Sequence, residues 1–232
     1  MTLLERCFTC GRVLFGQHEV SGWSHKFCLS HSRESRCASC NLPIDSKSRV
    51  KLCGQCGPMA ISDVSVLRVA LPEVRLQLRK IGLRLGTPVR VKLVSPQSIA
   101  ASANDASPML HGLTLMTPHR SLEIQVLKGL SPARFGAVVA HETMHAYLNE
   151  QQIPQTHPST TEGMCELLAY MWLKSRVQSP LIRWETMRIE TNQDPVYGHG
   201  FCAAKACVEE LGLLETLSRI RFEGRLPNWE SR

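Results

Sequence analysis

Cysteine spacing is the feature that most constrains how the first part of this chain can fold. The chain has 232 residues and ten cysteines, seven of which lie in its first quarter. These are Cys7, Cys10, Cys28, Cys37, Cys40, Cys53 and Cys56. An odd number of cysteines cannot pair completely as disulfides, whereas seven thiolates and one histidine supply the eight ligands of two tetrahedral zinc sites. We therefore predict a double zinc-binding module over residues 1–57.

The second half of this module has the tighter ligand spacing. Two residues separate Cys37 from Cys40 and Cys53 from Cys56, and twelve residues lie between the two pairs. This spacing is typical of zinc ribbons and half-LIM units, in which two short turns each present a pair of thiolates to one ion. We assign these four cysteines to the second structural zinc.

The first structural zinc has three cysteine ligands and two competing histidines. Cys7 and Cys10 form its first pair, and Cys28 follows after seventeen residues. His25 and His31 are each separated from Cys28 by two residues, on opposite sides. Because both spacings suit tetrahedral zinc, the residues alone leave the fourth ligand open.

Residues 58–232 have the pattern of a second domain of the α+β class. Apolar residues recur at helical spacing from Leu67 to Leu85, with an interruption or restart expected at Pro72. Residues 95–110, rich in Ser, Ala and Asn, are predicted to form a loop over the cleft. Three strand-like runs are Val89–Val94, Leu113–Met116 and Ser121–Leu127. We expect a small sheet packed on helices.

A predicted helix from Ala133 to Gln151 carries the strongest chemical signal. Ser131 is expected to cap it, with Pro132 at the first helical position. Within it stands His141-Glu142-Thr143-Met144-His145, whose two histidines are four residues apart and can bind one Zn²⁺ from one helical face. Glu142 would then act as the general base on zinc-bound water, as in zinc peptidases.

A catalytic zinc needs a third protein ligand and an open fourth position. Thr160 or Thr161 is expected to cap a second helix, on which Glu162 and Glu166 lie one turn apart on the same face. We assign Glu162 as the ligand and Glu166 as the carboxylate that accepts the free ring N–H of a zinc histidine, with the reverse assignment as the alternative. His157, in a loop between two prolines, is the weakest candidate.

Two further features belong to the predicted site. Tyr197 and His199 lie in a glycine-containing loop before a helix expected from Cys202 to Leu211. Either side chain is a candidate to stabilise the oxyanion, and we assign Tyr197. Ser121–Leu127 is predicted to be an edge strand, to which an extended substrate peptide adds by main-chain pairing.

These residues together resemble a known family. It comprises the plant organ-size regulators called DA-one and DA-one-related, which are LIM-domain peptidases activated by ubiquitin, and their bacterial homologues. The similarity covers nearly the whole chain and is carried by Lys26–His31, Cys37–Cys56, Ala140–Ala146, Glu162–Cys165, Pro195–Phe201 and Gly224–Pro227. In those relatives a Cys-x2-His pair after a Lys-aromatic pair ends the first zinc knuckle, so the resemblance favours His31 over His25.

The resemblance implies a gluzincin-like peptidase domain over residues 58–232, preceded by a LIM-like module, with one catalytic and two structural zinc ions. It implies an endopeptidase that acts on proteins, with ubiquitin or a ubiquitin-like protein as a candidate regulator. The plant proteins carry ubiquitin-interacting helices and a fuller LIM domain outside the matching segments. Glu166 and His199 stand where glutamine and aspartate are expected. Ubiquitin activation and the plant substrates are therefore not carried over.

Charge and hydropathy indicate which classes of binding partner the chain is expected to have. The net charge is +7, but residues 1–57 hold eight Lys/Arg and four Asp/Glu, and seven thiolates on two Zn²⁺ reduce the formal +4 of this module to about +1. Because aromatic residues for base stacking are also few, nucleic acid is not an expected partner. Without an apolar run for a signal peptide or a membrane span, we expect a soluble cytoplasmic protein with a protein or peptide substrate and no membrane partner.

Two other functions fit parts of the pattern. SprT-like proteases, which are recruited by nucleic acid, combine HExxH with a zinc ribbon, but here the zinc module comes first. A non-catalytic zinc interaction module would not require Glu142 between two histidine ligands. We therefore predict a zinc-dependent endopeptidase whose N-terminal module serves recruitment or regulation.

Overall fold

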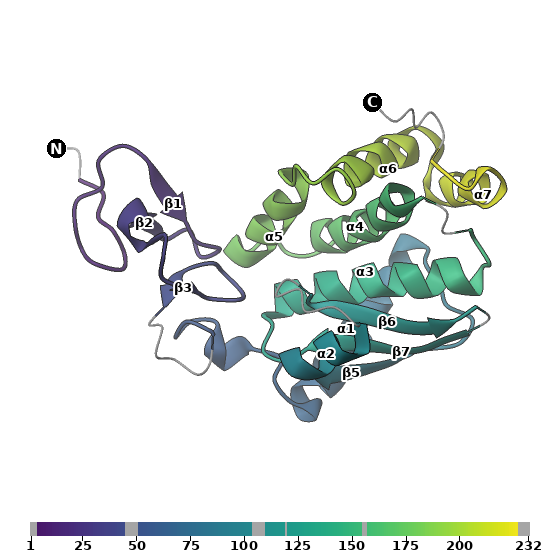
Figure 1. Ribbon diagram of the computed structural model, residues 1–232, viewed down its shortest axis with the longest axis horizontal. Coiled ribbons are helices and arrows are strands. Elements are labelled where there is room, and N and C mark those ends of the chain that lie inside the picture. Colours follow the sequence, from purple (N-terminus) through teal and green to yellow (C-terminus); the bar gives the residue numbers. More distant parts are fainter. Residues whose placement is uncertain (1–3, 45–50, 104–109, 119, 155–156, 227–232) are drawn as a thin grey trace.

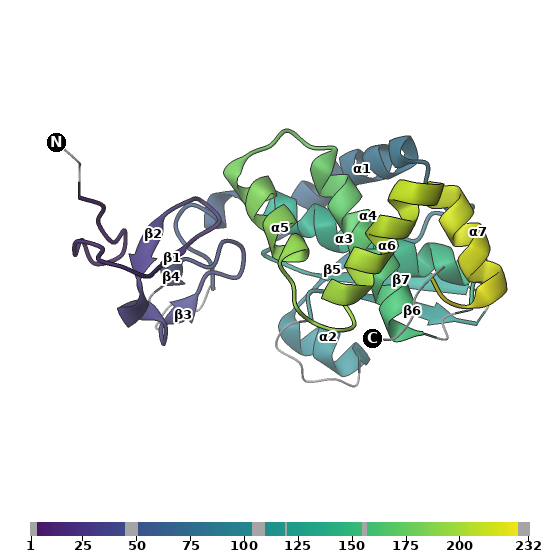
Figure 2. The ribbon, with the colours of Figure 1, turned by 90° about the horizontal axis from the view of Figure 1, so that it is seen from above.

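The structure, a computed structural model, describes residues 4–44, 51–103, 110–118, 120–154 and 157–226. A small cysteine-rich part at the N-terminus lies beside a larger α+β part (Figure 1). A view from above shows the same arrangement (Figure 2). Among the residues described, no helix is both long and apolar enough to cross a membrane.

The cysteine-rich part consists of short hairpins and turns. Its elements are β1 (His18–Val20) paired with β2 (Lys26–Cys28), β3 (Ser35–Arg36) paired with β4 (Pro43–Ile44), and the 3-10 helices η1 (Leu29–His31) and η2 (Gly57–Met59). Both strand pairs are antiparallel. Hairpins this short are marginal in water by themselves, so this part depends on other interactions for its stability.

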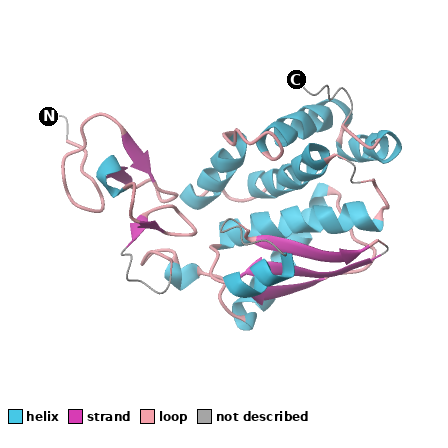
Figure 3. Cartoon of the chain, in the orientation of Figure 1, coloured by secondary structure: helices cyan, strands magenta, loops and turns pink. Residues whose placement is uncertain are grey.

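The larger part is a three-stranded sheet covered by helices (Figure 3). Its elements are α1 (Val64–Ile81), β5 (Arg90–Val94), α2 (Pro96–Ala103), β6 (Gly112–Thr117), β7 (Arg120–Leu127), α3 (Pro132–Glu150), α4 (Pro158–Lys174), α5 (Pro180–Glu190), α6 (Gly198–Leu211) and α7 (Leu213–Glu223). The sheet, α3, α4 and α6 follow one another as layers (Figure 1). The expected α+β class, with a small sheet packed on helices, is what the structure shows.

The strand order corrects one prediction. The sheet has the order β5-β7-β6, with β5 parallel and β6 antiparallel to β7. The run Ser121–Leu127 is therefore part of the central strand, and its prediction as an edge strand is wrong because both of its sides already pair within the sheet. The edge strand that packs on α3 is β6.

Helix α1 differs from its predicted form. It continues through Pro72 without interruption and ends before Gly82, whose φ of +102° suits glycine, so Leu85 lies outside the helix. Pro72 is exposed, while the buried face of α1 carries Leu67, Val74 and Leu78. Burial of that face stabilises the helix enough to tolerate one proline.

Three other segments are more helical than predicted. The run 95–110 contains α2 instead of a continuous loop, and its residues 104–109 lie outside those described. Helix α4 has His157 as its N-cap residue, so the capping predicted for Thr160 or Thr161 is wrong. Helix α6 begins at Gly198, four residues before the start predicted at Cys202. In α2 and α4 a proline stands at the start of the helix, where its missing N–H costs nothing.

The N-terminus of α3 joins the two parts of the molecule. Its predicted cap is confirmed, because the Ser131 hydroxyl accepts the N–H of Arg134 and Pro132 follows the cap. The N–H of Ser131 in turn donates to the Ser39 hydroxyl of the cysteine-rich part at 2.9 Å, and both residues are buried. A β-bridge between Ile61 and Leu130 lies just before this cap. The cysteine-rich part therefore holds the end of the helix that carries the His-Glu motif.

Glycines set how closely the helices pack. A Cβ atom on Gly163 of α4 would lie 2.3 Å from the carbonyl oxygen of Gly200 in α6. A Cβ atom on Gly136 of α3 would lie 2.0 Å from the Trp172 ring of α4. Because these glycines have no side chain, the backbones of α4 and α6 come into direct contact and the Trp172 ring lies against the backbone of α3. Neither α3 and α4 nor α4 and α6 can therefore shift easily against each other.

We predict that Gly163→Ala destabilises the protein although alanine is the better helix former. Helix propensity alone would favour alanine by about 1 kcal/mol, but the clash with the Gly200 backbone should dominate and leave a net loss of about 1–3 kcal/mol. Thermal unfolding should show a lower Tm, by roughly 2–4 °C per kcal/mol. Gly57→Ala is the matched control, since nothing lies within 4 Å of the added Cβ there. Equal Tm values for wild type and Gly163→Ala would contradict the packing described.

Candidate zinc sites and active site

The first cysteine cluster brings together three thiols and one histidine. One ligand atom from each of Cys7, Cys10, Cys28 and His31 lies within 4.8 Å of the others. The Sγ atoms of Cys10 and Cys28 are 3.8 Å apart, and those of Cys28 and Cys7 are 3.7 Å apart. A tetrahedral zinc with Zn–S bonds of about 2.3 Å places its sulfur ligands about 3.8 Å apart. The cluster therefore has the dimensions of a zinc site.

The surroundings of His31 fit the same ion. Its Nδ1 lies 2.6 Å from Oε1 of Glu34, whereas its Nε2 is buried without a hydrogen-bond partner. A zinc-ligating histidine commonly donates its other ring N–H to a carboxylate, which orients the ring. The unpartnered Nε2 beside three thiols is therefore suited to a metal, and unpaired it would carry a desolvation cost.

His25 is occupied elsewhere. Its ring stacks on Phe8 with centroids 3.8 Å apart, and its Nε2 lies 3.0 Å from Oε1 of Gln55. The structure thus places His31, not His25, with the three cysteines.

The second cluster consists of four buried cysteines. Cys37, Cys40, Cys53 and Cys56 lie within 4.8 Å of one another, with the Sγ atoms of Cys40 and Cys53 3.7 Å apart. The indole N–H of Trp23 donates to Sγ of Cys56 at 3.2 Å. Donors directed at sulfur favour the thiolate, which is the form that binds zinc. Both clusters are of the kind found in LIM-like zinc modules.

A third cluster lies between α3 and α4. His141 and His145 of α3 both face Glu162 of α4, with Nε2–Oε2 distances of 3.2 and 3.6 Å. Ligands bound to zinc at about 2.0–2.2 Å are roughly 3.3–3.6 Å apart in a tetrahedral site. On the outer side of His141, Nδ1 lies 3.2 Å from Oε1 of Glu166. The structure thus brings Glu162 to the two Nε2 atoms and Glu166 to the opposite nitrogen of one ring.

The pKa values show how strongly these groups interact. Burial lowers the pKa of His141, but hydrogen bonds to Glu162 and Glu166 outweigh it and raise the pKa to about 10. Burial likewise raises the pKa of Glu162, yet His141 and His145 lower it to about 2. The negative charge of Glu162 beside two histidine nitrogens is suited to a divalent cation, which would replace the proton that the raised pKa keeps on His141.

The motif carboxylate is held by the edge strand. The Thr114 hydroxyl of β6 lies 2.7 Å from Oε2 of Glu142 and 2.9 Å from the Glu142 carbonyl oxygen. A Cβ atom on Gly112, also in β6, would lie 2.7 Å from Oε1 of Glu142. Neither Thr114 nor Gly112 was identified from the sequence. The available signal was that they stand two residues apart, and so on the same face, in the second strand before the motif helix.

A cleft of about 340 Å³ opens beside this cluster. Its walls include His141, Glu142, Glu166 and Tyr197, together with Gly112. The Tyr197 ring centroid lies 6.5 Å from that of His141, and burial together with Glu162 and Glu166 raises the pKa of Tyr197 to about 12. Tyr197 therefore remains a hydrogen-bond donor at neutral pH.

Other candidates lie outside the cluster or were missed. His199 is exposed and does not line the cleft, and His157 bonds Ser159 through Nδ1 at 2.9 Å. Cys165, one turn after Glu162, lies with both motif histidines and Glu162 within 4.8 Å, although the sequence indicated only a buried apolar residue. Burial raises the pKa of the Cys165 thiol well above its usual value, which favours the neutral form.

Two arginines, Arg134 and Arg188, form part of the cleft wall. Nε of the buried Arg134 lies 2.7 Å from the Glu185 carboxylate, which also approaches Nε of Arg188 at 3.3 Å. One carboxylate thus faces two guanidinium groups, so this wall keeps a positive charge. The sequence did not indicate these residues, because their pairing connects α3 to α5.

Fold and clusters together define a mixed α+β protein with Cys/His groups of the zinc-binding, LIM-like type. Residues 75–187 match the family model described as "DA1-like: Protein DA1". This match and the similarity to curated relatives support membership in the DA1-like family, which is the family that the resemblance predicted.

Three relatives illustrate the similarity. Protein DA1-related 1 and Protein DA1-related 2 of Arabidopsis thaliana are each 25% identical over 88% of this chain, which covers 51% and 54% of their lengths. The LIM domain-containing protein HDR3 of Oryza sativa subsp. japonica is 22% identical over 88% of this chain and 57% of its own length. This chain thus spans about half the length of the curated relatives it matches. No solved structure matches it.

We predict that His31→Ala lowers the zinc content of the purified protein by one ion per chain, because the Cys7–Cys28 cluster loses its only nitrogen ligand. His25→Ala is the matched control, since His25 lies three residues from the same cysteine but contacts Phe8 and Gln55 instead. Elemental analysis by mass spectrometry measures both. The loss of one zinc from His25→Ala and not from His31→Ala would contradict the assignment.

Proposed function

We propose that this protein is a zinc-dependent endopeptidase of the gluzincin-like type, with a catalytic zinc held by His141, His145 and Glu162. The observation that carries the proposal is the convergence of both Nε2 atoms on Oε2 of Glu162, at 3.2 and 3.6 Å, with Glu142 in the adjoining cleft. A set of two histidines and one glutamate is that of the catalytic zinc in thermolysin-like hydrolases. Residues 58–232 would form the peptidase domain and residues 1–57 the zinc module.

Each side chain around the cleft has a defined task in peptide hydrolysis. A zinc ion held by His141, His145 and Glu162 would supply Lewis-acid chemistry to the attacking water and the scissile carbonyl. Glu142 accepts the proton of the attacking water and delivers it to the leaving amine. Tyr197 donates a hydrogen bond to the oxyanion that forms at the carbonyl. Glu166 accepts the N–H of His141 at Nδ1 and so orients the ring.

Strand β6 is the proposed platform for the substrate. It is an edge of the sheet and packs on α3, and Gly112 and its neighbour His111 line the cleft. An extended peptide can pair with such an edge through main-chain hydrogen bonds. Protein segments that are unfolded or flexible would meet this requirement.

The contact between Ser39 and Ser131 suggests how the zinc module influences the site. Ser39 stands between the cluster residues Cys37 and Cys40, and its hydroxyl accepts the N–H of the residue that caps α3. We propose that the module regulates or recruits by way of this contact. A ubiquitin-like regulator is proposed from the family resemblance alone. Eight free thiolate or imidazole ligands suit a reducing compartment such as the cytoplasm.

The proposal predicts that Glu142→Gln abolishes cleavage and leaves the metal sites intact. The change removes the base and keeps the size of the side chain, so the purified variant should contain three zinc ions per chain, like the wild type. Cleavage of an unfolded protein such as casein should fall by at least about 10²-fold, the lower end of the range for general bases. The measurements are elemental mass spectrometry and a gel-based cleavage assay.

Two outcomes would contradict this. Equal cleavage by wild type and Glu142→Gln would mean that hydrolysis does not occur at this site. Two zinc ions in the wild type with no cleavage would favour a non-catalytic zinc interaction module. Glu150→Gln is a matched control on α3, since that carboxylate bonds the N–H of Gly86 and does not line the cleft.

We also predict that Thr114→Val lowers kcat without loss of zinc. Valine has nearly the shape of threonine but cannot donate the 2.7 Å hydrogen bond to Oε2 of Glu142, so the carboxylate loses its fixed orientation. We expect a decrease in kcat of about tenfold, the effect of one hydrogen bond to a charged group. Thr117→Val in the same strand is the control, because its hydroxyl bonds the Arg120 carbonyl and not Glu142. Unchanged kcat in Thr114→Val would show that this hydroxyl does not position the base.

A further inference from the structure

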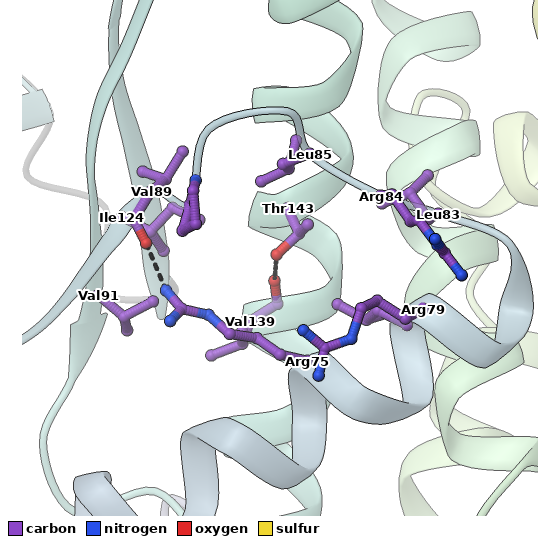
Figure 4. Close-up of a pocket in the computed structure, with 12 residues that line it drawn as sticks. Arg75, Arg79, Leu83, Arg84, Leu85, Val89, Val91, Ile124, Val139 and Thr143 are labelled. Atoms are coloured by element: carbon purple, nitrogen blue, oxygen red, sulfur yellow. Dashed lines mark hydrogen bonds between the residues drawn. The ribbon is translucent and has the colours of Figure 1, made fainter.

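A separate cavity of about 160 Å³ lies on another side of the motif helix (Figure 4). It is formed between α1, the segment that joins α1 to β5, the sheet and α3. Its apolar lining includes Leu78, Leu83, Val89, Val91, Ile124 and Val139. An apolar cavity of about 150 Å³ is large enough to hold a benzene molecule.

The cavity and the His-Glu cluster use different faces of α3. Val139 and Thr143, one turn apart, line the cavity, whereas Val138, His141 and Glu142 line the cleft. At roughly 100° per residue, the mean directions of the two sets differ by about 130° around the helix axis, although Val139 and Glu142 themselves differ by only about 60°. A molecule in the cavity would therefore contact the motif helix without entering the cleft.

Three arginines make one side of the cavity strongly basic. Arg75, Arg79 and Arg84 all line it, and Figure 4 shows Arg75 and Arg79 extending from α1 along its side. The Arg75 guanidinium donates to the Val89 carbonyl oxygen, which fixes that side chain. Within the part of the chain that the structure describes, none of the three arginines forms an ion pair with a carboxylate, and the cavity has no acidic lining residue.

The pKa of Arg75 indicates that the positive charge at the cavity is not neutralised by a carboxylate of the described residues. Burial lowers the pKa of Arg75, and the charge of Arg79 lowers it further. Among the residues that the structure describes, no carboxylate raises this pKa in return. An anion placed between these guanidinium groups would relieve their repulsion and form charge-assisted hydrogen bonds. An arginine face that only contacts solvent is not expected to adjoin a concave apolar surface, whereas a binding site for an amphipathic anion is.

We propose that this cavity binds a small amphipathic carboxylate, with an apolar body of about six carbons against Val139 and Ile124 and its carboxylate on Arg79 and Arg84. The apolar volume limits the size of the body, and the planar guanidinium groups select a carboxylate over a neutral polar group. Arg75, already bonded to Val89, would shape the entrance. This site is independent of the proposed peptidase activity, since it includes neither the zinc ligands nor Glu142.

The test titrates benzoate and its neutral isostere benzamide into the zinc-loaded full chain, observed by ¹H–¹³C methyl NMR. Benzoate should cause saturable shifts of the Val139, Ile124 and Leu83 methyls, and benzamide should bind at least about tenfold more weakly. The double variant Arg79→Gln/Arg84→Gln should weaken benzoate binding by a similar factor. Lys80→Gln is the matched control, because Lys80 is a basic residue of α1 that does not line the cavity.

Several results would overturn the proposal. Methyl shifts that do not saturate, or shifts confined to residues outside the cavity, would exclude a site there. Equal affinity for benzoate and benzamide, or an equal effect of Lys80→Gln, would show that Arg79 and Arg84 do not recognise the carboxylate. Saturable shifts with the peptide acetyl-Glu-Leu-Glu but not with benzoate would assign the cavity to an acidic protein segment instead. No cleavage assay enters this test, so the peptidase proposal can fail or succeed separately.

Discussion

The antiparallel packing of α3 on α4 is the interaction on which the rest of the structure depends. It places the two motif histidines opposite Glu162, and His141 opposite Glu166. The helices can approach closely because Gly136 leaves room for the Trp172 ring. A shift by one residue would rotate each side chain by about 100° and separate the ligand atoms. The proposed chemistry therefore rests on apolar packing between two helices as much as on the polar residues themselves.

The two ends of this helix pair are held by different means. At the N-terminus of α3, Ser131 caps the helix and donates to Ser39 between two cysteines of the second cluster. At the start of α4, Gly163 contacts the backbone of Gly200 and so brings α6, with Tyr197 before it, to the cleft. Loss of metal from the second cluster would loosen Ser39. The zinc module and the cleft are in this way connected by one short hydrogen-bonded path.

Much of this arrangement follows from local sequence signals, and the parts that do not are long-range. The Ser131 cap and the four-residue spacing within the motif are properties of one helix, so short-range rules suffice to predict them. Strand β7 is central because β5 pairs with it in parallel, although α2 and β6 lie between the two strands in the sequence. The alternation of residues along one strand cannot reveal such pairing. Thr114 contacts Glu142 across 28 residues, and the space beside Gly112 exists only once the strand lies on α3. Residues of this kind are found by geometry, not by spacing.

A crystal structure of the purified protein, with an anomalous difference map recorded at the zinc absorption edge, would locate the metal ions. We expect three peaks, one in each cysteine cluster and one between α3 and α4 within about 2.0–2.2 Å of Nε2 of His141, Nε2 of His145 and a Glu162 oxygen. Peaks in the cysteine clusters alone would contradict the catalytic metal site. A third peak bound by Cys165 in place of Glu162 would contradict the ligand set and, with it, the assignment of Glu162.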